Sequence, residues 1–298
     1  MTPLYMLAFD HRSSFSHDLL GITREPTADE AARVADIKLV VYEGFELALS
    51  DGIERGSAGL LVDEQYGAEI ARRAREAGVA LAMPVERSGR AEFEFEFGEE
   101  FGLHIERFDP RFAKVLVRYN PEGDLEANAR QRARLRRLSD WLHERDRKLL
   151  FELLVPAEPE QLERVDGDAG RYDLELRPDL VVQTIGEIQD SGIEADIWKI
   201  EGLDRREDCE RVATQARSGG REHVSCIVLG RGADDARVLH WLEQAAPVPG
   251  YIGFAVGRTL WWNELVAYVA DEIERGEAAA RIADNYRRMI QAYVRCTP

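Results

Sequence analysis

Short apolar runs alternate with longer amphipathic segments along the whole chain. Eight runs have the length and composition of β-strands, at residues 4–9, 59–62, 79–83, 112–119, 148–155, 193–200, 223–229 and 251–256. Apolar residues at helical spacing predict helices at residues 28–49, 66–77, 124–145, 179–190, 205–217, 234–244 and 258–274. Strands that alternate with helices in this way are typical of βα units around a parallel sheet.

The strands are apolar at successive positions, which indicates a sheet covered on both faces. No glycine-rich dinucleotide-binding motif follows the first strand. Eight βα units without that motif favour a (β/α)8 barrel over a doubly wound sheet, and we expect residues 1–298 to form one such domain. Thr27 and Asp204 are expected to cap the helices that follow them.

Two segments do not fit this repeat. Residues 86–110 contain the alternation Glu92-Phe93-Glu94-Phe95-Glu96-Phe97, which predicts an added strand or hairpin before the fourth barrel strand. Residues 278–294 carry an apolar stripe at helical spacing, formed by Ile282, Tyr286, Met289, Ile290 and Tyr293. We expect this extra C-terminal helix to pack across the barrel or against another subunit, which leaves a homo-oligomer open.

Charge and cysteine usage narrow the function classes. The net charge is −17, from 39 basic and 56 acidic residues, and it argues against nucleic acid or an anionic membrane as a partner. The N-terminus has no basic segment followed by a long apolar stretch, and no run approaches 18 apolar residues. Three widely spaced cysteines, Cys209, Cys226 and Cys296, suit reduced thiols. We therefore expect a cytoplasmic protein.

Two lysines stand in apolar strand-like runs, Lys114 and Lys199. A lysine in water has a pKa of about 10.4, so its amine is almost always protonated at neutral pH. Burial and a nearby cation both favour the neutral amine, which is the form that attacks carbonyl carbons to make Schiff bases. If the two lysines converge, the chain is a candidate imine-forming enzyme. The alternative is that their ammonium groups reach solvent from the strand ends.

Active sites of (β/α)8 barrels lie at the C-terminal ends of the strands, and here those ends are rich in polar residues. The first strand delivers Asp10, His11 and Arg12, and the third is followed by Glu86. Because side chains alternate along a strand, Lys114, Glu152 and Lys199 are expected to point inward from three neighbouring strands. One lysine would form the imine, the other would lower its pKa, and Glu152 would move protons. The alternative is that Glu152 only neutralises a buried lysine.

The last two strands end in Gly-Arg pairs, Gly230-Arg231 and Gly257-Arg258. Glycine permits close backbone approach and arginine supplies a fork of donors, so both pairs suit a phosphate group. The second pair also opens a helix, whose N-terminal amides favour an anion. No histidine cluster has metal-ligand spacing. Asp10 and Asp63 could still hold a divalent ion in an enolising lyase, which is the metal-dependent alternative.

Several motifs together resemble the class I tagatose-bisphosphate aldolases, and more closely the aldolase-like C-terminal domain of bifunctional 5-dehydro-2-deoxygluconokinases of inositol catabolism. They are Leu7-Ala8-Phe9-Asp10-His11-Arg12, Leu61-Val62-Asp63-Glu64-Gln65-Tyr66-Gly67, Lys114-Val115-Leu116, Phe151-Glu152-Leu153, Trp198-Lys199-Ile200-Glu201 and Gly253-Phe254-Ala255-Val256-Gly257-Arg258. The resemblance covers nearly the whole chain and implies a (β/α)8 barrel that needs no cofactor and no metal.

The resemblance also implies roles for individual residues. Lys199 would be the Schiff-base lysine, Lys114 the second lysine, Glu152 the proton-transfer acid, and Asp10 a contact to the substrate hydroxyls. Gly230, Gly257 and Arg258 would lie near phosphate. Two departures leave the sugar open: His11 replaces a glutamine common in the tagatose enzymes, and Arg118 adds a cation.

The expected activity is therefore cleavage of a phosphorylated keto sugar or keto acid by a class I aldolase. The first substrate we consider is 5-dehydro-2-deoxygluconate 6-phosphate, which would yield dihydroxyacetone phosphate and malonate semialdehyde. We expect His11, Arg12, Arg118 and Arg231 to contact substrate together with the phosphate-binding residues. The alternatives are an aldolase of the same mechanism for another ketose phosphate, and a sugar-phosphate-binding barrel without turnover.

Overall fold

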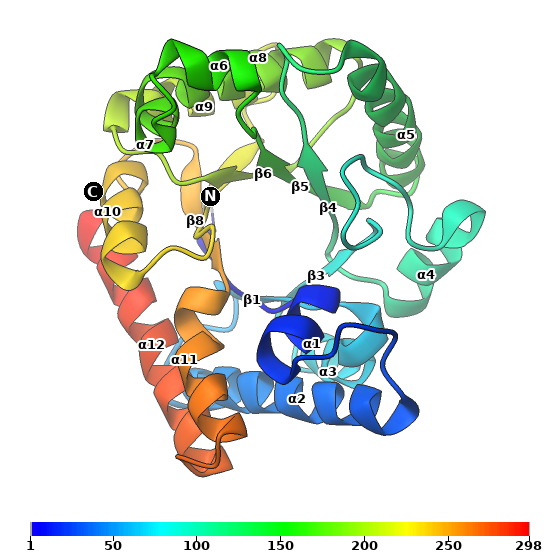
Figure 1. The fold of residues 1–298 in the computed structure, drawn as a ribbon, viewed down its shortest axis with the longest axis vertical. Coiled ribbons are helices and arrows are strands. Elements are labelled where there is room, and N and C mark those ends of the chain that lie inside the picture. The colour runs from blue at the N-terminus through cyan, green and yellow to red at the C-terminus, as the bar shows by residue number, and fades with distance from the viewer. Residues whose placement is uncertain (1, 298) are drawn as a thin grey trace.

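Eight parallel strands pair in sequence order and close into a barrel, as the alternation of strands and helices predicts. The computed structural model describes residues 2–297 (Figure 1). The strands are β1 (Leu4–Ala8), β2 (Ala58–Leu61), β3 (Ala80–Pro84), β4 (Phe112–Arg118), β5 (Lys148–Leu154), β6 (Ile197–Glu201), β7 (Ser225–Leu229) and β8 (Tyr251–Val256). The fold prediction is thereby confirmed.

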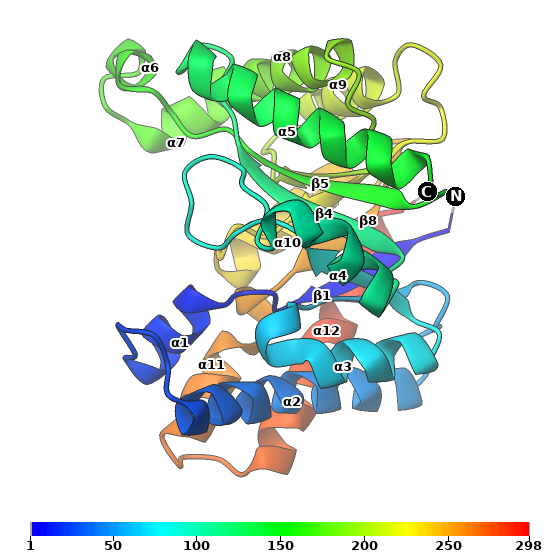
Figure 2. The same cartoon turned by 90° about the vertical axis from the view of Figure 1, so that its right-hand side faces the viewer.

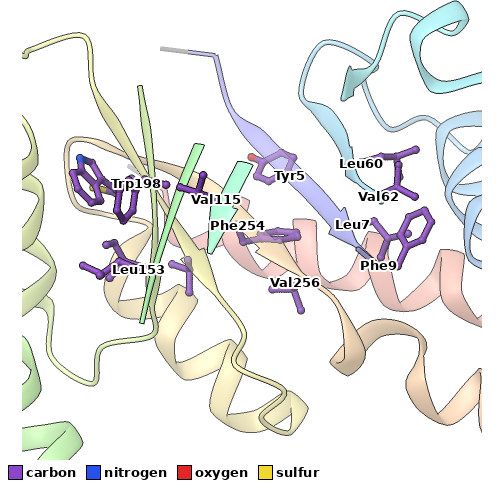
Figure 3. Close-up of a cluster of buried hydrophobic side chains, with 14 of the residues drawn as sticks. Tyr5, Leu7, Phe9, Leu60, Val62, Val115, Leu153, Trp198, Phe254 and Val256 are labelled. Atoms are coloured by element: carbon purple, nitrogen blue, oxygen red, sulfur yellow. The ribbon is translucent and has the colours of Figure 1, made fainter. Parts of the chain in front are cut away.

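Alternation along each strand creates two separate apolar layers. Outward-facing side chains such as Leu7, Val115 and Phe254 pack between the strands and the helices (Figure 3). Inward-facing side chains fill the barrel interior, among them Met6 and Leu150. On β4 to β6 an apolar inward residue is followed, two positions later, by an ionisable one: Phe112 by Lys114, Leu150 by Glu152, and Ile197 by Lys199. The barrel is therefore packed at its base and carries ionisable groups at its mouth.

An outer layer of helices surrounds the strands (Figure 1). Its members are α2 (Ala28–Ser50), α3 (Glu64–Glu76), α4 (Phe101–Phe108), α5 (Leu125–His143), α8 (Arg177–Asp190), α9 (Arg206–Ala216), α10 (Asp235–Ala245) and α12 (Arg275–Cys296). Shorter pieces lie in the loops: α1 (Ser13–Leu20), a 3-10 turn (Gly98–Glu100), α6 (Pro159–Arg164), α7 (Ala169–Arg171) and a π-helical turn (Tyr172–Leu176). Helix α11 (Arg258–Val269) follows β8 and packs against α12. Helices α1, α6 and α7 lie at the end of the barrel opposite the chain termini (Figure 2).

The C-terminal helix α12 packs on the outside of the barrel, along α2 and against α10 and α11. Its apolar stripe is buried at Ile282, Tyr286, Met289 and Tyr293. The Tyr286 hydroxyl donates a hydrogen bond of 2.6 Å to the Tyr5 carbonyl, which ties the helix to β1. Two helices thus follow β8, and the second of them completes the outer layer between α10 and α2.

The prediction of a strand or hairpin within residues 86–110 is confirmed only in part, as a short antiparallel contact. The segment forms a single antiparallel bridge between Glu86 and Phe95, then a 3-10 turn and α4. Two of the three alternating phenylalanines, Phe95 and Phe97, pack on α4. The Phe95 ring stacks on Phe101 at a centroid distance of 4.3 Å, and Phe97 stacks on His104 at 3.4 Å.

Two element boundaries differ from the prediction more than the others. Strand β6 begins at Ile197 instead of residue 193, and α11 ends at Val269, shortly before Asp271 adopts a φ of 57°. The capping box at Thr27 is confirmed, but Asp204 caps no helix. Its carboxylate instead accepts hydrogen bonds from Trp241 and Arg237, both at 2.8 Å. Within residues 2–297, no helix is long and apolar enough to cross a membrane.

Candidate active site

Strand register places Lys199 level with Glu152, and Lys114 one inward position nearer the base of the barrel. Glu152 on β5 lies beside Lys199 on β6, and Leu116, two residues after Lys114 on β4, lies beside Glu152 on its other side. Residues two apart on a strand share a face. Lys114, Glu152 and Lys199 therefore all point into the barrel mouth from three adjacent strands.

Glu152 bridges the two lysines. Its Oε2 atom lies 3.0 Å from the Nζ atom of Lys114 and 3.0 Å from the Nζ atom of Lys199. Lys114 Nζ also lies 2.9 Å from Asp10 Oδ2 and 2.6 Å from Glu86 Oε1. The lysines and Glu152 are 1%, 3% and 5% exposed, so these contacts are shielded from bulk water. Lys114 has three carboxylate partners and Lys199 has one.

The surroundings of each group decide its protonation. Burial disfavours the charged form of Lys114, but the carboxylates of Asp10, Glu152 and Glu86 outweigh it and raise the pKa of Lys114 well above its usual value. Burial also works against ionised Asp10 and Glu152, yet the neighbouring lysines lower the pKa of both carboxyl groups. Lys114 is therefore a fixed cation, and Asp10 and Glu152 are carboxylates at neutral pH.

Glu86 behaves differently from the other two acids. Burial is the largest influence on it and raises the pKa of Glu86 despite the nearby Lys114 and Arg12. Its Oε2 atom has no hydrogen-bond partner in the part of the chain that the structure describes. Arg12 donates to the Glu86 carbonyl at 2.7 Å and to Glu96 Oε2 at 2.9 Å. Arg12 thus holds the Glu86 segment in place, and its guanidinium already has a carboxylate partner.

His11 lines the same cavity on the β1 side. Burial lowers the pKa of His11 to about 4, and the charge of Asp10 only partly opposes this. The imidazole meets the edge of Trp261 at a centroid distance of 5.5 Å. His11 is therefore a neutral imidazole at physiological pH, able to donate or accept one hydrogen bond at each nitrogen.

The Gly-Arg pairs lie on the β7 and β8 side of the mouth. A Cβ atom on Gly257 would lie 2.4 Å from the Ala8 carbonyl oxygen, so the chain there requires glycine. Arg258 lies across Gly232 and forms no hydrogen bond or ion pair with any residue from 2 to 297. Arg231, in contrast, lies 2.7 Å from Asp173 and 3.1 Å from Glu201. Of the two arginines, only Arg258 is without a counter-charge.

These groups surround one cavity of about 360 Å³ at the barrel mouth. All eleven residues that the sequence assigns to the aldolase reaction line it: Asp10, His11, Arg12, Lys114, Arg118, Glu152, Lys199, Gly230, Arg231, Gly257 and Arg258. The structure brings them together, while their individual roles stay predictions. Across the described residues 2–297, no group of three His, Cys, Asp or Glu side chains is arranged to hold a metal ion.

Asp63, the second carboxylate of the metal-dependent alternative, does not line this cavity. It is fully buried, forms an ion pair with Lys38, and accepts a hydrogen bond of 2.8 Å from the Tyr66 amide. Its carboxylate caps α3 and neutralises a buried cation. A metal shared between Asp10 and Asp63 is therefore inconsistent with this geometry.

Sequence reasoning assigned no role to Lys38 and Glu86, both of which support the site. Lys38 is buried on α2 and donates to the carbonyls of Phe9 at 2.9 Å and His11 at 2.7 Å, so it holds the loop that carries Asp10. The sequence did contain a signal for Lys38. Only four of the 39 basic residues are lysines, so each lysine could have been considered individually. Three of them are buried near this cavity, and Lys148 alone is exposed.

Fold and site together define a class: a (β/α)8 barrel with a buried Lys-Glu-Lys cluster at its mouth. Within that class, the chain belongs to a family described as "Uncharacterized protein conserved in bacteria (DUF2090)", whose model matches residues 1–297. No curated protein is significantly similar to it. The structure resembles that of a structural-genomics protein from Corynebacterium glutamicum, with a TM-score of 0.58 and 19% identity over 96% of this chain and 86% of the other. At that identity, the likeness concerns the fold alone.

Proposed function

We propose that this chain is a class I aldolase that cleaves a phosphorylated keto sugar or keto acid through a Schiff base on Lys199. The observation that carries the proposal is the position of Glu152 Oε2, 3.0 Å from two buried lysines, one of which is held permanently charged. A binding protein would gain nothing from burying two ammonium groups, because their desolvation is costly.

The cluster divides the chemistry between its members. Lys199 has Glu152 as its one carboxylate partner, and Glu152 can accept the proton that the attacking amine must lose. The amine adds to the keto carbon, and Glu152 returns the proton as the carbinolamine loses water. Lys114 stays an ammonium group and holds Glu152 and Asp10 in position. The resulting iminium accepts the electron pair of the cleaved carbon–carbon bond, so the proposed reaction requires no Lewis acid.

The first substrate we propose is 5-dehydro-2-deoxygluconate 6-phosphate. The imine would form at C5, and cleavage of the C3–C4 bond would release malonate semialdehyde as the C3 hydroxyl gives its proton to the Glu152 carboxylate. Glu152 would return this proton to C4 of the enamine, and hydrolysis of the imine would then release dihydroxyacetone phosphate. Support comes from the sequence motifs that resemble the aldolase-like domain of inositol catabolism, and from the free Arg258 on the β8 side of the cavity.

Borohydride trapping with dihydroxyacetone phosphate tests the mechanism. We expect one reduced adduct per chain by intact mass, located on Lys199 by peptide mapping. Lys199→Met should abolish the adduct, while the control Lys148→Met should keep it, because Lys148 is exposed at the N-terminal end of β5. An adduct on Lys114 would reverse the assignment of the two lysines. Absence of any adduct in the unmodified protein would contradict the proposed function.

A further inference from the structure

The arginines of the cavity fall into two groups. Six of them line it, namely Arg12, Arg87, Arg90, Arg118, Arg231 and Arg258. Arg12, Arg90 and Arg231 each have a carboxylate within 4.0 Å. Among residues 2–297, neither Arg87, Arg118 nor Arg258 has such a partner. Free guanidinium groups in a cavity of a protein with net charge −17 indicate that an anion is to be bound there.

The free arginines stand on opposite walls. In the closed barrel, three strands separate β4 from β8 in either direction, so the two strands face each other. Arg258 follows β8, whereas Arg118 ends β4 and Arg87 lies in the loop after β3. Lys199 and Glu152 lie on β6 and β5, between these walls. The cavity therefore has two cationic sides with the reactive lysine between them.

Arg118 is the last residue of β4, so its backbone is held in the barrel sheet. It shares a face of β4 with Lys114, and with it lines the cavity. Its Nη1 atom donates to the Arg90 carbonyl at 3.1 Å, which leaves the rest of the guanidinium fork available. A planar fork of donors matches the two oxygens of a carboxylate.

We propose that Arg118, assisted by Arg87, binds a carboxylate on the half of the substrate that leaves as the aldehyde. This inference rests on the proposed function and narrows its substrate class to phosphorylated keto acids with an anion at each end. When the phosphate lies at Arg258 and the keto carbon at Lys199, the opposite end of the chain faces β3 and β4. The C1 carboxylate of the proposed substrate is at that end.

The test uses the condensation direction, with dihydroxyacetone phosphate and one of three acceptors: malonate semialdehyde, propanal or glyceraldehyde 3-phosphate. Propanal has the same three carbons and no charge. We expect Arg118→Gln to lower kcat/KM for malonate semialdehyde by about 10- to 100-fold, the usual effect of losing a charge-assisted contact, and for propanal by less than about 3-fold. The matched control is Arg111→Gln, an unpaired arginine directly before the other end of the same strand.

The other possible results distinguish a carboxylate site from a second phosphate site and from no anion site. Equal losses on malonate semialdehyde and propanal, or no loss on either, would overturn the proposed carboxylate site. A larger loss on glyceraldehyde 3-phosphate than on malonate semialdehyde would show that this wall binds a second phosphate, which also contradicts the proposal. Calorimetric titration with malonate measures carboxylate binding to this site in the absence of any reaction. If malonate binding depends on Arg118 but no adduct forms on Lys199, the anion site stands and the aldolase function fails.

Discussion

Glu152 and Glu86 both contact Lys114, yet their surroundings shift the pKa values of the two carboxyl groups in opposite directions. Glu152 lies between two lysines, which lower its pKa although burial opposes this, and it is positioned to accept a proton from Lys199. Glu86 has Lys114 and Arg12 nearby, but burial dominates and raises its pKa. We infer that Glu152 transfers protons during the reaction, whereas Glu86 orients the Lys114 ammonium group.

This difference predicts different effects of the same substitution. Glu152→Gln removes the proton acceptor of Lys199, and we expect kcat to fall by about 100- to 10,000-fold, the range typical of general acid–base catalysis. Glu86 contacts Lys114 but forms no ion pair with Lys199, and Glu86→Gln keeps the shape of its side chain, so we expect a fall of less than about 10-fold. Steady-state assays of dihydroxyacetone phosphate release measure both. A larger loss in Glu86→Gln would transfer the proton-transfer role to Glu86.

Lys38 illustrates what one sequence cannot reveal at the scale of a residue. Its hydrogen bonds reach the carbonyls of Phe9 and His11, 29 and 27 residues earlier in the chain. Only the folded barrel shows that this cation steadies the loop behind Asp10. The inward direction of Lys114, Glu152 and Lys199, in contrast, follows from strand alternation alone and could be predicted.

At the scale of elements, close helix packing depends on single glycines. Gly44 lies where α2 meets α12, and a Cβ atom there would approach the Ala279 carbonyl oxygen and Ile282 Cγ2 to 2.8 Å. Gly186 is also inside a helix, α8, but its nearest neighbour, Gln215, would be 3.5 Å from an added Cβ atom. The two positions share a backbone conformation and differ in the space around them.

Alanine at these two glycines should therefore change stability in opposite directions. Gly44→Ala gains up to about 1 kcal/mol of helix propensity but forces two packed helices apart at a cost of about 1–3 kcal/mol. We expect a net loss in the free energy of unfolding. Gly186→Ala keeps the propensity gain, so we expect stabilisation by about 0.5–1 kcal/mol. Urea unfolding measures both, and stabilisation by both substitutions would mean that α2 and α12 are not in close contact at Gly44.

Helices and strands could be predicted where the apolar residues of a segment follow a single period, that of a helix or that of a strand. The eight strands and the outer helices, apart from α4, follow from it, with ends shifted by a few residues. At Glu92–Phe97 the prediction was only partly right. Alternation of glutamate and phenylalanine has the period of a strand, but the pairing is limited to one bridge, and Phe95 and Phe97 pack on α4, which could not be located from this segment. Short loop helices such as α1 and α6 were also missed, because they are too short to show a period.

At the scale of the whole molecule, the net negative charge repels the anionic substrate that we propose, and free basic side chains lie at the barrel mouth. Acidic residues outnumber basic ones by 56 to 39, so the overall field repels a phosphate dianion. We propose that binding comes from local donors on the β7 and β8 side: the Arg258 guanidinium, the glycine amides of the two loops, and the first turn of α11. These groups come from separate parts of the chain, and closure of the barrel brings them together.

Arg258→Ala tests this arrangement, since Arg258 is the one free cation of the described residues on that side of the cavity. A charge-assisted contact to phosphate contributes about 1.5–3 kcal/mol, so kcat/KM for dihydroxyacetone phosphate as donor should fall by about one to two orders of magnitude. With unphosphorylated dihydroxyacetone the loss should be much smaller, because the contact is missing in both proteins. Arg111→Ala, at the opposite end of the barrel, should change neither value. Equal losses on both donors would show that Arg258 supports the barrel or the lysines, and the phosphate would then have to bind elsewhere, with Arg231 and Arg118 the next residues to replace.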